Sequence, residues 1–295
     1  MALPDRVVLC EVGPRDGFQY EDQFIPSDLK VEIIRGLAEA GMPRIQVTSF
    51  VHPKWVPQMA DAEEVVAALP RLPNVRYSGL ALNRKGVERA HDAGLLAVDV
   101  SIATWDEHSL DNANMTVDEA TEQALAMVET ARGFGMEAQI GLQTVFGFRE
   151  PGDTPLDRVV AMVERFVPLG VESVSLADTT GLAHPQMIAE RVQAVREVTG
   201  DIPLVLHLHD TRGLGLANVY EALRQGVDRF DTSLAGMGGC PFIRGAAGNI
   251  ATEDTVYLLD ALGIHTGVDR ESVAACSRRI SSVLGKTYPG KLYKL

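Results

Sequence analysis

The chain alternates short apolar runs with longer segments of helical periodicity, and this alternation limits the fold more than any other feature. The runs are rich in Val, Ile and Leu, as in VVLCEV and PLVLHLH. Eight are expected to be strands, over residues 7–12, 44–50, 75–82, 97–103, 137–145, 171–178, 203–209 and 229–236. Strands that alternate with helices predict parallel β/α units.

The segments between the runs have the apolar spacing of amphipathic helices and end near glycine. The clearest are residues 27–41, 83–94, 116–135 and 156–170. Eight strand and helix units over about 260 residues favour a closed (β/α)8 TIM barrel of the α/β class. An open, doubly wound sheet is the alternative, but the segment after the first run, EVGPRDGFQ, contains no GxGxxG.

The whole chain, residues 1–295, is expected to form a single barrel domain. A helix predicted over 269–279 belongs to a C-terminal helical extension, from about 265 to 295. No Pro/Gly/Ser-rich linker or low-complexity tract divides the chain. With 46% hydrophobic and 23% charged residues, the composition is that of a globular protein with a large core.

Charge and hydropathy disfavour several classes of partner. The formal net charge of −13 argues against nucleic acid or an anionic membrane. No apolar stretch approaches the roughly 20 residues of a membrane helix, and the N-terminus lacks a signal-peptide pattern. We therefore expect a cytoplasmic protein. The three cysteines have no CxxC spacing, so a disulfide framework or a structural zinc site is not expected.

In a TIM barrel, the active site lies at the C-terminal ends of the strands and in the loops that follow them. The polar residues predicted at these positions are Arg15, Asp16, Gln19, Gln46, Thr48, Ser49, Asp178, His207, His209, Asp210, Cys240 and Asn249.

The pair His207 and His209 would share one face of a strand, because side chains alternate with a period of two. Strands 7, 8 and 1 become neighbours when the barrel closes, so Asp16 and Asn249 can reach the same place. Two imidazoles, a carboxylate and an amide oxygen suit octahedral Mg²⁺ or Mn²⁺ better than tetrahedral zinc. The alternative is two buried histidines hydrogen-bonded to the backbone.

Arg15 would stand beside this metal as a fixed cation and polarise a carbonyl oxygen as it becomes an enolate. A salt bridge to Glu11 is the structural alternative, and it would also hold the guanidinium in place. Asp178 is a candidate general acid or base, or a group that orients a substrate hydroxyl. Its structural alternative is a helix N-cap.

The glycine-rich stretch 235–249 has the composition of an active-site lid, and Cys240 lies within it. A thiol on such a loop can deliver or accept a proton when the lid closes. Cys10, in a strand, and Cys276, in the C-terminal helix, are expected to be inert.

Five stretches together resemble one enzyme family over nearly the whole chain. They are EVGPRDGFQ, TSFVHPKWVPQMADAEEV, SLADTTG, HLHDTRGLGLANV and SLAGMGGCPFIRGAAGNIATEDTVYLLDALGIHTGV. They are similar to the 3-hydroxy-3-methylglutaryl-CoA lyase family, within the metal-dependent barrel superfamily that includes isopropylmalate and homocitrate synthases. The resemblance implies a divalent-metal-dependent retro-aldol cleavage of a 3-hydroxyacyl-CoA to acetyl-CoA and acetoacetate, a step of leucine degradation.

The resemblance also assigns roles residue by residue. It implies metal ligands at Asp16, His207, His209 and Asn249. It further implies a carbonyl-polarising cation at Arg15, a catalytic thiol at Cys240, proton transfer at His207 and a catalytic acid at Asp178. Gln19, Gln46 and Thr48 are expected to line the substrate pocket.

Two departures from the family pattern bear on the substrate. The family carries glutamate in IETTSF where this chain has Gln46 in IQVTSF, which is expected to leave the site one unit more positive. After strand 5, LQTVFGFREPG stands where the family pattern resembles SCxxGCPYEG. A lyase for citramalyl-CoA or for a longer-branched 3-hydroxyglutaryl-CoA therefore stays open.

Two further functions and the assembly state also stay open. A synthase that joins acetyl-CoA to a 2-oxo acid would use the same metal, but only a short extension is expected after the barrel. A protein that binds metal or takes part in an assembly without catalysing a reaction is the alternative outside the enzymes. The sequence leaves a homo-oligomer open as well.

Overall fold

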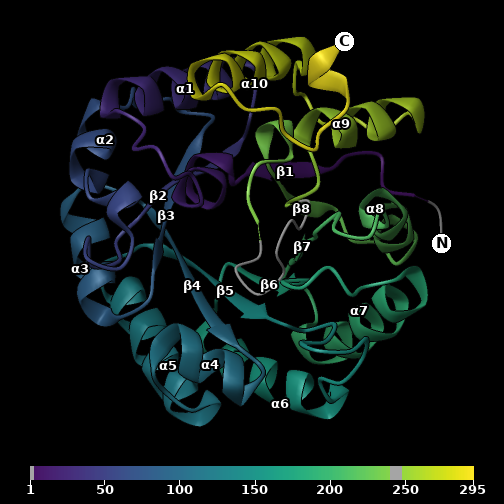
Figure 1. The fold of residues 1–295 in the computed structure, drawn as a ribbon. Coiled ribbons are helices and arrows are strands. Elements are labelled where there is room, and N and C mark those ends of the chain that lie inside the picture. The colour runs from purple at the N-terminus through teal and green to yellow at the C-terminus, as the bar shows by residue number, and fades with distance from the viewer. Residues whose placement is uncertain (1–2, 240–247) are drawn as a thin grey trace.

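The computed structural model describes residues 3–239 and 248–295. Within them, eight parallel strands close into a barrel in chain order (Figure 1). The strands are β1 Val8–Glu11, β2 Arg44–Ser49, β3 Arg76–Ala81, β4 Ala97–Ala103, β5 Glu137–Gln143, β6 Ser173–Ala177, β7 Leu204–His207 and β8 Arg229–Thr232. The closed barrel confirms the predicted fold, and the open-sheet alternative is wrong.

Closure joins the first and last strands. Val8 is the register partner of Arg229, and Glu11 is that of Thr232. Because all eight strands run in the same direction, their C-terminal ends meet at one end of the barrel. Closure therefore brings the turn after β1 next to the segments that follow β7 and β8.

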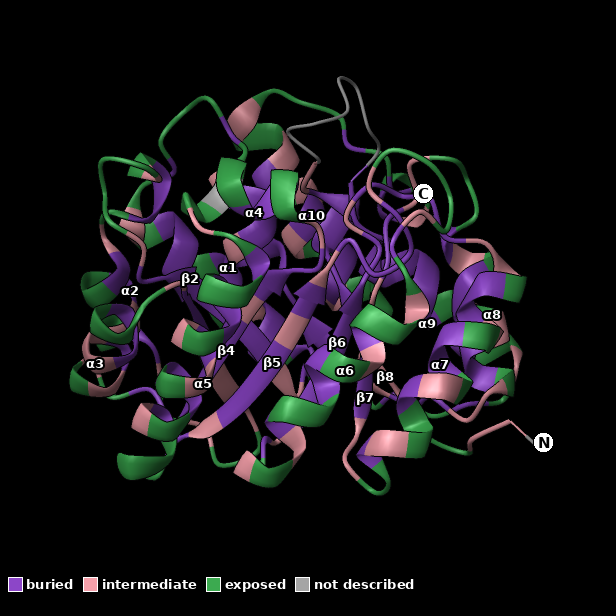
Figure 2. Ribbon diagram, turned by 90° about the horizontal axis from the view of Figure 1, so that it is seen from below, coloured by how far each residue is buried: buried purple, intermediate pink, exposed green. Residues whose placement is uncertain are grey.

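Ten α-helices in the described residues surround the strands (Figure 1). They are α1 Ser27–Glu39, α2 Ala62–Ala68, α3 Arg84–Asp92, α4 Asp106–Ala113, α5 Val117–Gly133, α6 Leu156–Phe166, α7 Pro185–Thr199, α8 Gly215–Arg224, α9 Thr252–Ala261 and α10 Arg270–Leu284. Figure 2 shows exposed residues on their outer sides and buried residues along the strands.

Helix α6 illustrates how the apolar spacing covers the barrel. Its buried residues are Val159, Met162, Val163 and Phe166, which recur at the spacing of one helical face. The opposite face carries exposed charged residues. The apolar stripe therefore joins the single hydrophobic core that the strands and helices share.

Local signals explain where individual elements begin and end. Thr116 and Glu119 form a reciprocal capping box at the start of α5. Strand β7 ends at His207, two residues earlier than predicted, and His209 instead forms an isolated bridge with Asn249. The pairing of β7 with β6 and with β8 ends at His207 on both sides.

The C-terminal helix α10 packs beside α1 and α9 (Figure 1). It covers more residues than the predicted 269–279, and its N-cap is Asp269, whose side chain accepts a hydrogen bond from Glu271 N. Among the described helices, none combines the length and apolar character needed to span a bilayer.

Candidate active site and metal centre

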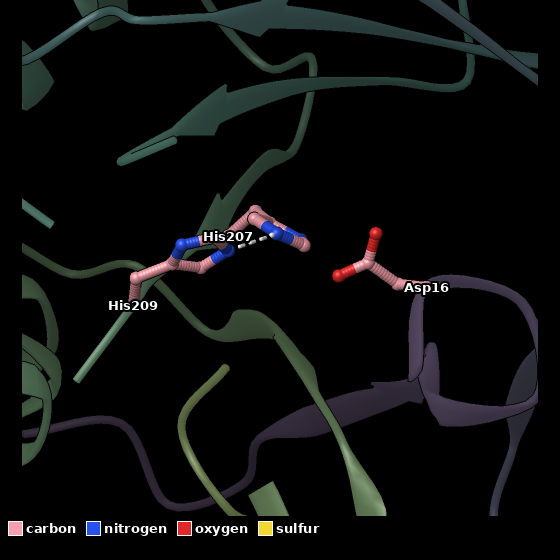
Figure 3. A group of neighbouring side chains, drawn as sticks. All are labelled: Asp16, His207 and His209. Atoms are coloured by element: carbon pink, nitrogen blue, oxygen red, sulfur yellow. Dashed lines mark hydrogen bonds between the residues drawn. The ribbon is translucent and has the colours of Figure 1, made fainter. Parts of the chain in front are cut away.

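Asp16, His207 and His209 converge at the C-terminal end of the barrel. Each offers one ligand atom, and these atoms lie within 4.8 Å of one another. The two imidazole Nε2 atoms face each other at 3.2 Å. In Figure 3, Asp16 reaches toward His207 from the segment that follows β1. Residues almost 200 positions apart in the sequence thus form one cluster, as predicted from barrel closure.

The GPRDG sequence places Asp16 in a π-helical turn, η1 Gly13–Gly17. A Cβ atom on Gly13 would lie 2.1 Å from Leu234 Cδ2, and one on Gly17 would lie 2.7 Å from Met237 Cβ. The turn therefore packs directly on the segment after β8, an approach that only glycine allows.

Asn249 completes the cluster. Its Nδ2 donates to Asp16 Oδ2 at 2.7 Å and to the Met237 carbonyl at 2.9 Å. Its Oδ1 is buried and has no hydrogen-bond partner in the described part of the chain. Such an orphaned oxygen beside a carboxylate and two imidazoles fits a divalent cation, because the cation would satisfy it. The four predicted ligands therefore fit a divalent cation.

The protonation states also fit a metal. Burial lowers the pKa of His209 to about 4, helped by the neighbouring His207, so its imidazole is neutral at pH 7. Burial alone would raise the pKa of Asp16, but Arg15 and the two histidines hold it below its ordinary value. A neutral imidazole and an ionised carboxylate are the forms that bind metal ions.

Arg15 lies beside the cluster and is held from two sides. Its guanidinium donates to Asp16 Oδ1 through Nη1 and to Gln46 Oε1 through Nε. The side chain is only 12% exposed. A nearly desolvated cation next to the ligand cluster is placed to stabilise an oxyanion.

Among the described residues Arg15 pairs with Asp16, so the structural alternative of a salt bridge to Glu11 is not found. Glu11 is fully buried, and its Oε1 accepts hydrogen bonds from the backbone N–H groups of Gly13 and Leu234. Its other oxygen accepts from Thr252 Oγ1. Glu11 therefore fixes the start of the η1 turn rather than the guanidinium.

Comparison with known proteins agrees with this geometry. The profile of the HMGL-like family matches residues 6–280. This chain belongs to the HMGL-like family. A Pseudomonas aeruginosa protein named 3-hydroxy-3-isohexenylglutaryl-CoA/hydroxy-methylglutaryl-CoA lyase is 40% identical over 287 residues, covering 97% of this chain and 96% of that protein.

Two solved structures of HMG-CoA lyases share the fold closely. That of Bacillus subtilis is 35% identical, with a TM-score of 0.96 over 100% of this chain and 99% of that chain. That of Acinetobacter baumannii, in complex with coenzyme A and 3-methylmalate, is 37% identical, with a TM-score of 0.93 over 100% and 96%. Both lyase structures therefore share the architecture of this chain from end to end.

Asp178 follows β6 at the same end of the barrel. Its Oδ1 accepts hydrogen bonds from Leu182 N at 2.8 Å and Ala183 N at 3.1 Å, whereas Oδ2 is buried without a partner among the described residues. Burial raises its pKa to about 7, against the lowering effect of these two hydrogen bonds. Asp178 is not the N-cap of α7, because His184 holds that position.

The three predicted pocket residues lie in different surroundings. Gln19 Nε2 donates to Asp16 Oδ1 at 3.2 Å, so this side chain joins the cluster. Gln46 binds Arg15, as described above. Thr48 is buried, and its hydroxyl contacts Met59 Sδ at 3.6 Å rather than the cluster. Cys240, the predicted catalytic thiol, lies outside the described residues.

Sequence reasoning missed Asp231. This carboxylate lies on β8 as the register partner of His207, and its Oδ2 is 3.2 Å from His207 Nδ1. A carboxylate that holds one nitrogen of a ligand histidine fixes its tautomer and ring orientation. The available signal was an acidic residue in the apolar run RFDTSLAG, but strand register is not readable from the sequence.

Proposed function

We propose that this chain is a divalent-metal-dependent carbon–carbon lyase that cleaves 3-hydroxy-3-methylglutaryl-CoA into acetyl-CoA and acetoacetate. The observation that carries the proposal is the cluster of Asp16, His207 and His209 with Arg15 at its edge. Membership of the HMGL-like family and near-full-length similarity to lyases support it.

The proposed reaction is a retro-aldol cleavage. The substrate's 3-hydroxyl loses its proton, and the bond between C2 and C3 breaks as the new carbonyl of acetoacetate forms. The electron pair of that bond moves onto the thioester, which becomes an enolate. A proton delivered to C2 then gives acetyl-CoA.

Asp16, His207, His209 and Asn249 would hold the cation. When bound, a divalent cation supplies Lewis-acid stabilisation of the substrate's oxygen atoms. Mg²⁺ or Mn²⁺ is proposed because the donor set is mixed nitrogen and oxygen without thiolate.

The chain's own residues supply the remaining chemistry. Arg15 would stabilise the thioester oxygen as negative charge develops on it. Because the Arg15 side chain is nearly buried, water screens this attraction only weakly. With a pKa of about 7, Asp178 exchanges a proton readily at neutral pH, so it is suited to take up or return a proton. His207 is the second candidate for proton transfer, and Cys240 is proposed to protonate the enolate.

A longer-branched substrate is the second candidate. The Pseudomonas aeruginosa relative is named for both 3-hydroxy-3-isohexenylglutaryl-CoA and the methyl substrate. The segment after β5 also departs from the family pattern. We further propose that the enzyme works in the cytoplasm and contributes to leucine degradation when the methyl compound is its substrate.

The test is a panel of thioesters assayed for acetyl-CoA release. It includes 3-hydroxy-3-methylglutaryl-CoA, 3-hydroxy-3-isohexenylglutaryl-CoA and citramalyl-CoA, each with Mg²⁺, with Mn²⁺ and with chelator. We expect metal-dependent release, with the highest kcat/KM for the methyl compound. A preference for a longer branch would favour the second candidate, and no release from any thioester would contradict the lyase function.

A further inference from the structure

A chain of polar contacts runs from Arg15 into the barrel through Gln46 to Asp99. Gln46 Oε1 accepts from Arg15 Nε, and Gln46 Nε2 donates to Asp99 Oδ2 at 2.5 Å. Gln46 and Asp99 are each only 4% exposed. Water therefore does not compete strongly for these groups, and each hydrogen bond depends on the protein partner.

This arrangement allows the Gln46 amide one orientation. Arg15 offers only donors, and the Asp99 carboxylate, which also accepts from Arg44 and Ser78, offers acceptors to Gln46. The amide oxygen must therefore face Arg15 and the amide nitrogen must face Asp99. If the amide turned over, donor would face donor on one side and acceptor would face acceptor on the other.

Asp99 is itself fixed by two further donors. Ser78 Oγ donates to Asp99 Oδ2 at 2.6 Å, and Arg44 Nη2 donates to Oδ1 at 2.8 Å. Arg44 is held in turn by Glu172 at 3.2 Å. Side chains of β2 and β3 therefore hold the Asp99 carboxylate in place. Its fixed position determines how the Gln46 amide is oriented.

We propose that Asp99 is a positioning residue that acts through Gln46 to set the Arg15 guanidinium against Asp16. The proposal deepens the lyase function proposed above, on which its kinetic test rests. The group next to Gln46 is thus a carboxylate, and it is itself paired with Arg44.

Asp99→Asn tests the proposal because it keeps the shape and changes the hydrogen-bond pattern. Arg44 can only donate, so it will attract the oxygen of the introduced amide, which turns the new NH2 group toward Gln46. The Gln46 amide must then reverse and present its own NH2 group to Arg15, which breaks the contact. Adding Gln46→Glu places a carboxylate at position 46. It can accept a hydrogen bond from Arg15 and another from the NH2 group introduced at position 99.

We expect Asp99→Asn to lower kcat about tenfold or more, the scale of a displaced catalytic group. Asp99→Asn with Gln46→Glu should return kcat to within about threefold of wild type, because neighbouring changes couple. Asp99→Asn with Gln193→Glu is the matched control. It restores the net charge at an exposed residue of α7, and it should not rescue kcat.

A second readout does not depend on catalysis. The Arg15 Nε–H proton should exchange slowly with water in NMR spectra of the wild type and of the rescued variant, and at least tenfold faster in Asp99→Asn. If Asp99→Asn does not fold, Gln46→Met replaces it, since it keeps the volume and removes both hydrogen bonds. Fast exchange in Gln46→Met then supports the step from Gln46 to Arg15, on which the role of Asp99 depends, and slow exchange overturns the proposal.

Two results would overturn the positioning role. One is an Arg15 Nε–H signal that is unchanged in Asp99→Asn or Gln46→Met. The other is equal kcat in Asp99→Asn with and without Gln46→Glu. A wild-type enzyme that releases no acetyl-CoA would contradict the lyase function separately, and the Arg15 signal would then decide the positioning role alone.

Discussion

His207 Nδ1 lies 3.2 Å from Asp231 Oδ2, across the pairing of β7 with β8. If the carboxylate accepts the Nδ1–H, the lone pair of His207 is on Nε2, the atom that faces His209. Asp231 thus selects the tautomer in which His207 can bind a metal ion.

Replacing Asp231 by asparagine should weaken metal binding without removing a ligand. The amide is a poorer acceptor and can turn its NH2 group toward the imidazole, which would favour the other tautomer. We expect the Kd for Mn²⁺ to rise about 10- to 100-fold, as is typical for a residue that orients a metal ligand. Isothermal titration calorimetry measures this directly. Asp228→Asn, at an exposed residue before β8, is the control and should bind as wild type does.

Removal of a predicted ligand should have a larger effect. In Asp16→Ala or His209→Ala, three protein ligands would remain, and the Kd should rise by more than about 100-fold. Acetyl-CoA release should fall in parallel. His265→Ala, at an exposed histidine, should change neither quantity. Wild-type metal content and turnover in both ligand variants would rule out the predicted metal site.

Much of the fold and of the cluster could be predicted from local sequence patterns. The eight apolar runs correspond to the eight strands because each run is buried and has a helix beside it. Barrel closure then brings Asp16 to His207 and His209, since it makes the first and last strands neighbours. These predictions needed only periodicity and the rule that parallel strands end on one side.

The hydrogen-bond partners could not be predicted in the same way. Asp231 contacts His207 on the neighbouring strand, and Asp99 contacts Gln46 from two strands away, so both contacts depend on how the whole sheet closes. A salt bridge from Glu11 to Arg15 was the structural alternative, but the backbone N–H groups of Gly13 in η1 and of Leu234 after β8 donate to the Glu11 carboxylate instead. Charge alone suggested the wrong partner because unpaired backbone donors also need acceptors in a buried turn.

The prediction for Cys240 rests on the sequence. Cys240→Ser should slow acetyl-CoA release by about 10² or more, because a hydroxyl has a much higher pKa than a thiol and transfers protons poorly at neutral pH. Cys276→Ser is the control. Burial raises the pKa of Cys276 to about 11, so its thiol stays protonated and should not contribute to turnover. Equal rates in wild type and Cys240→Ser, with cleavage rate-limiting, would exclude the thiol from the mechanism.

Glu11 should make the folded state less stable as the pH rises. Burial raises its pKa from 4.5 to about 8, against the lowering effect of its hydrogen bonds to Thr252, Leu234 and Gly13. The folded state therefore keeps a proton that the unfolded state loses between these pH values. The contribution to stability is complete below about pH 4.5 and is lost as the pH rises through 8.

Glu11→Gln removes this titration and keeps the acceptor oxygen for the backbone N–H groups of Gly13 and Leu234. Its NH2 group can donate to Thr252 Oγ1, whose own proton then goes to Thr232 Oγ1 at 2.9 Å. Relative to wild type, the free energy of unfolding of this variant should rise by about 2–3 kcal/mol between pH 5.5 and 8, because one pKa unit corresponds to about 1.4 kcal/mol. Urea unfolding at the two pH values measures the difference. Glu129→Gln, at an exposed residue of α5, should show no such change. If the free energies of unfolding of Glu11→Gln and wild type change with pH in parallel, Glu11 is ionised in the folded state. Its hydrogen bonds would then stabilise a buried carboxylate.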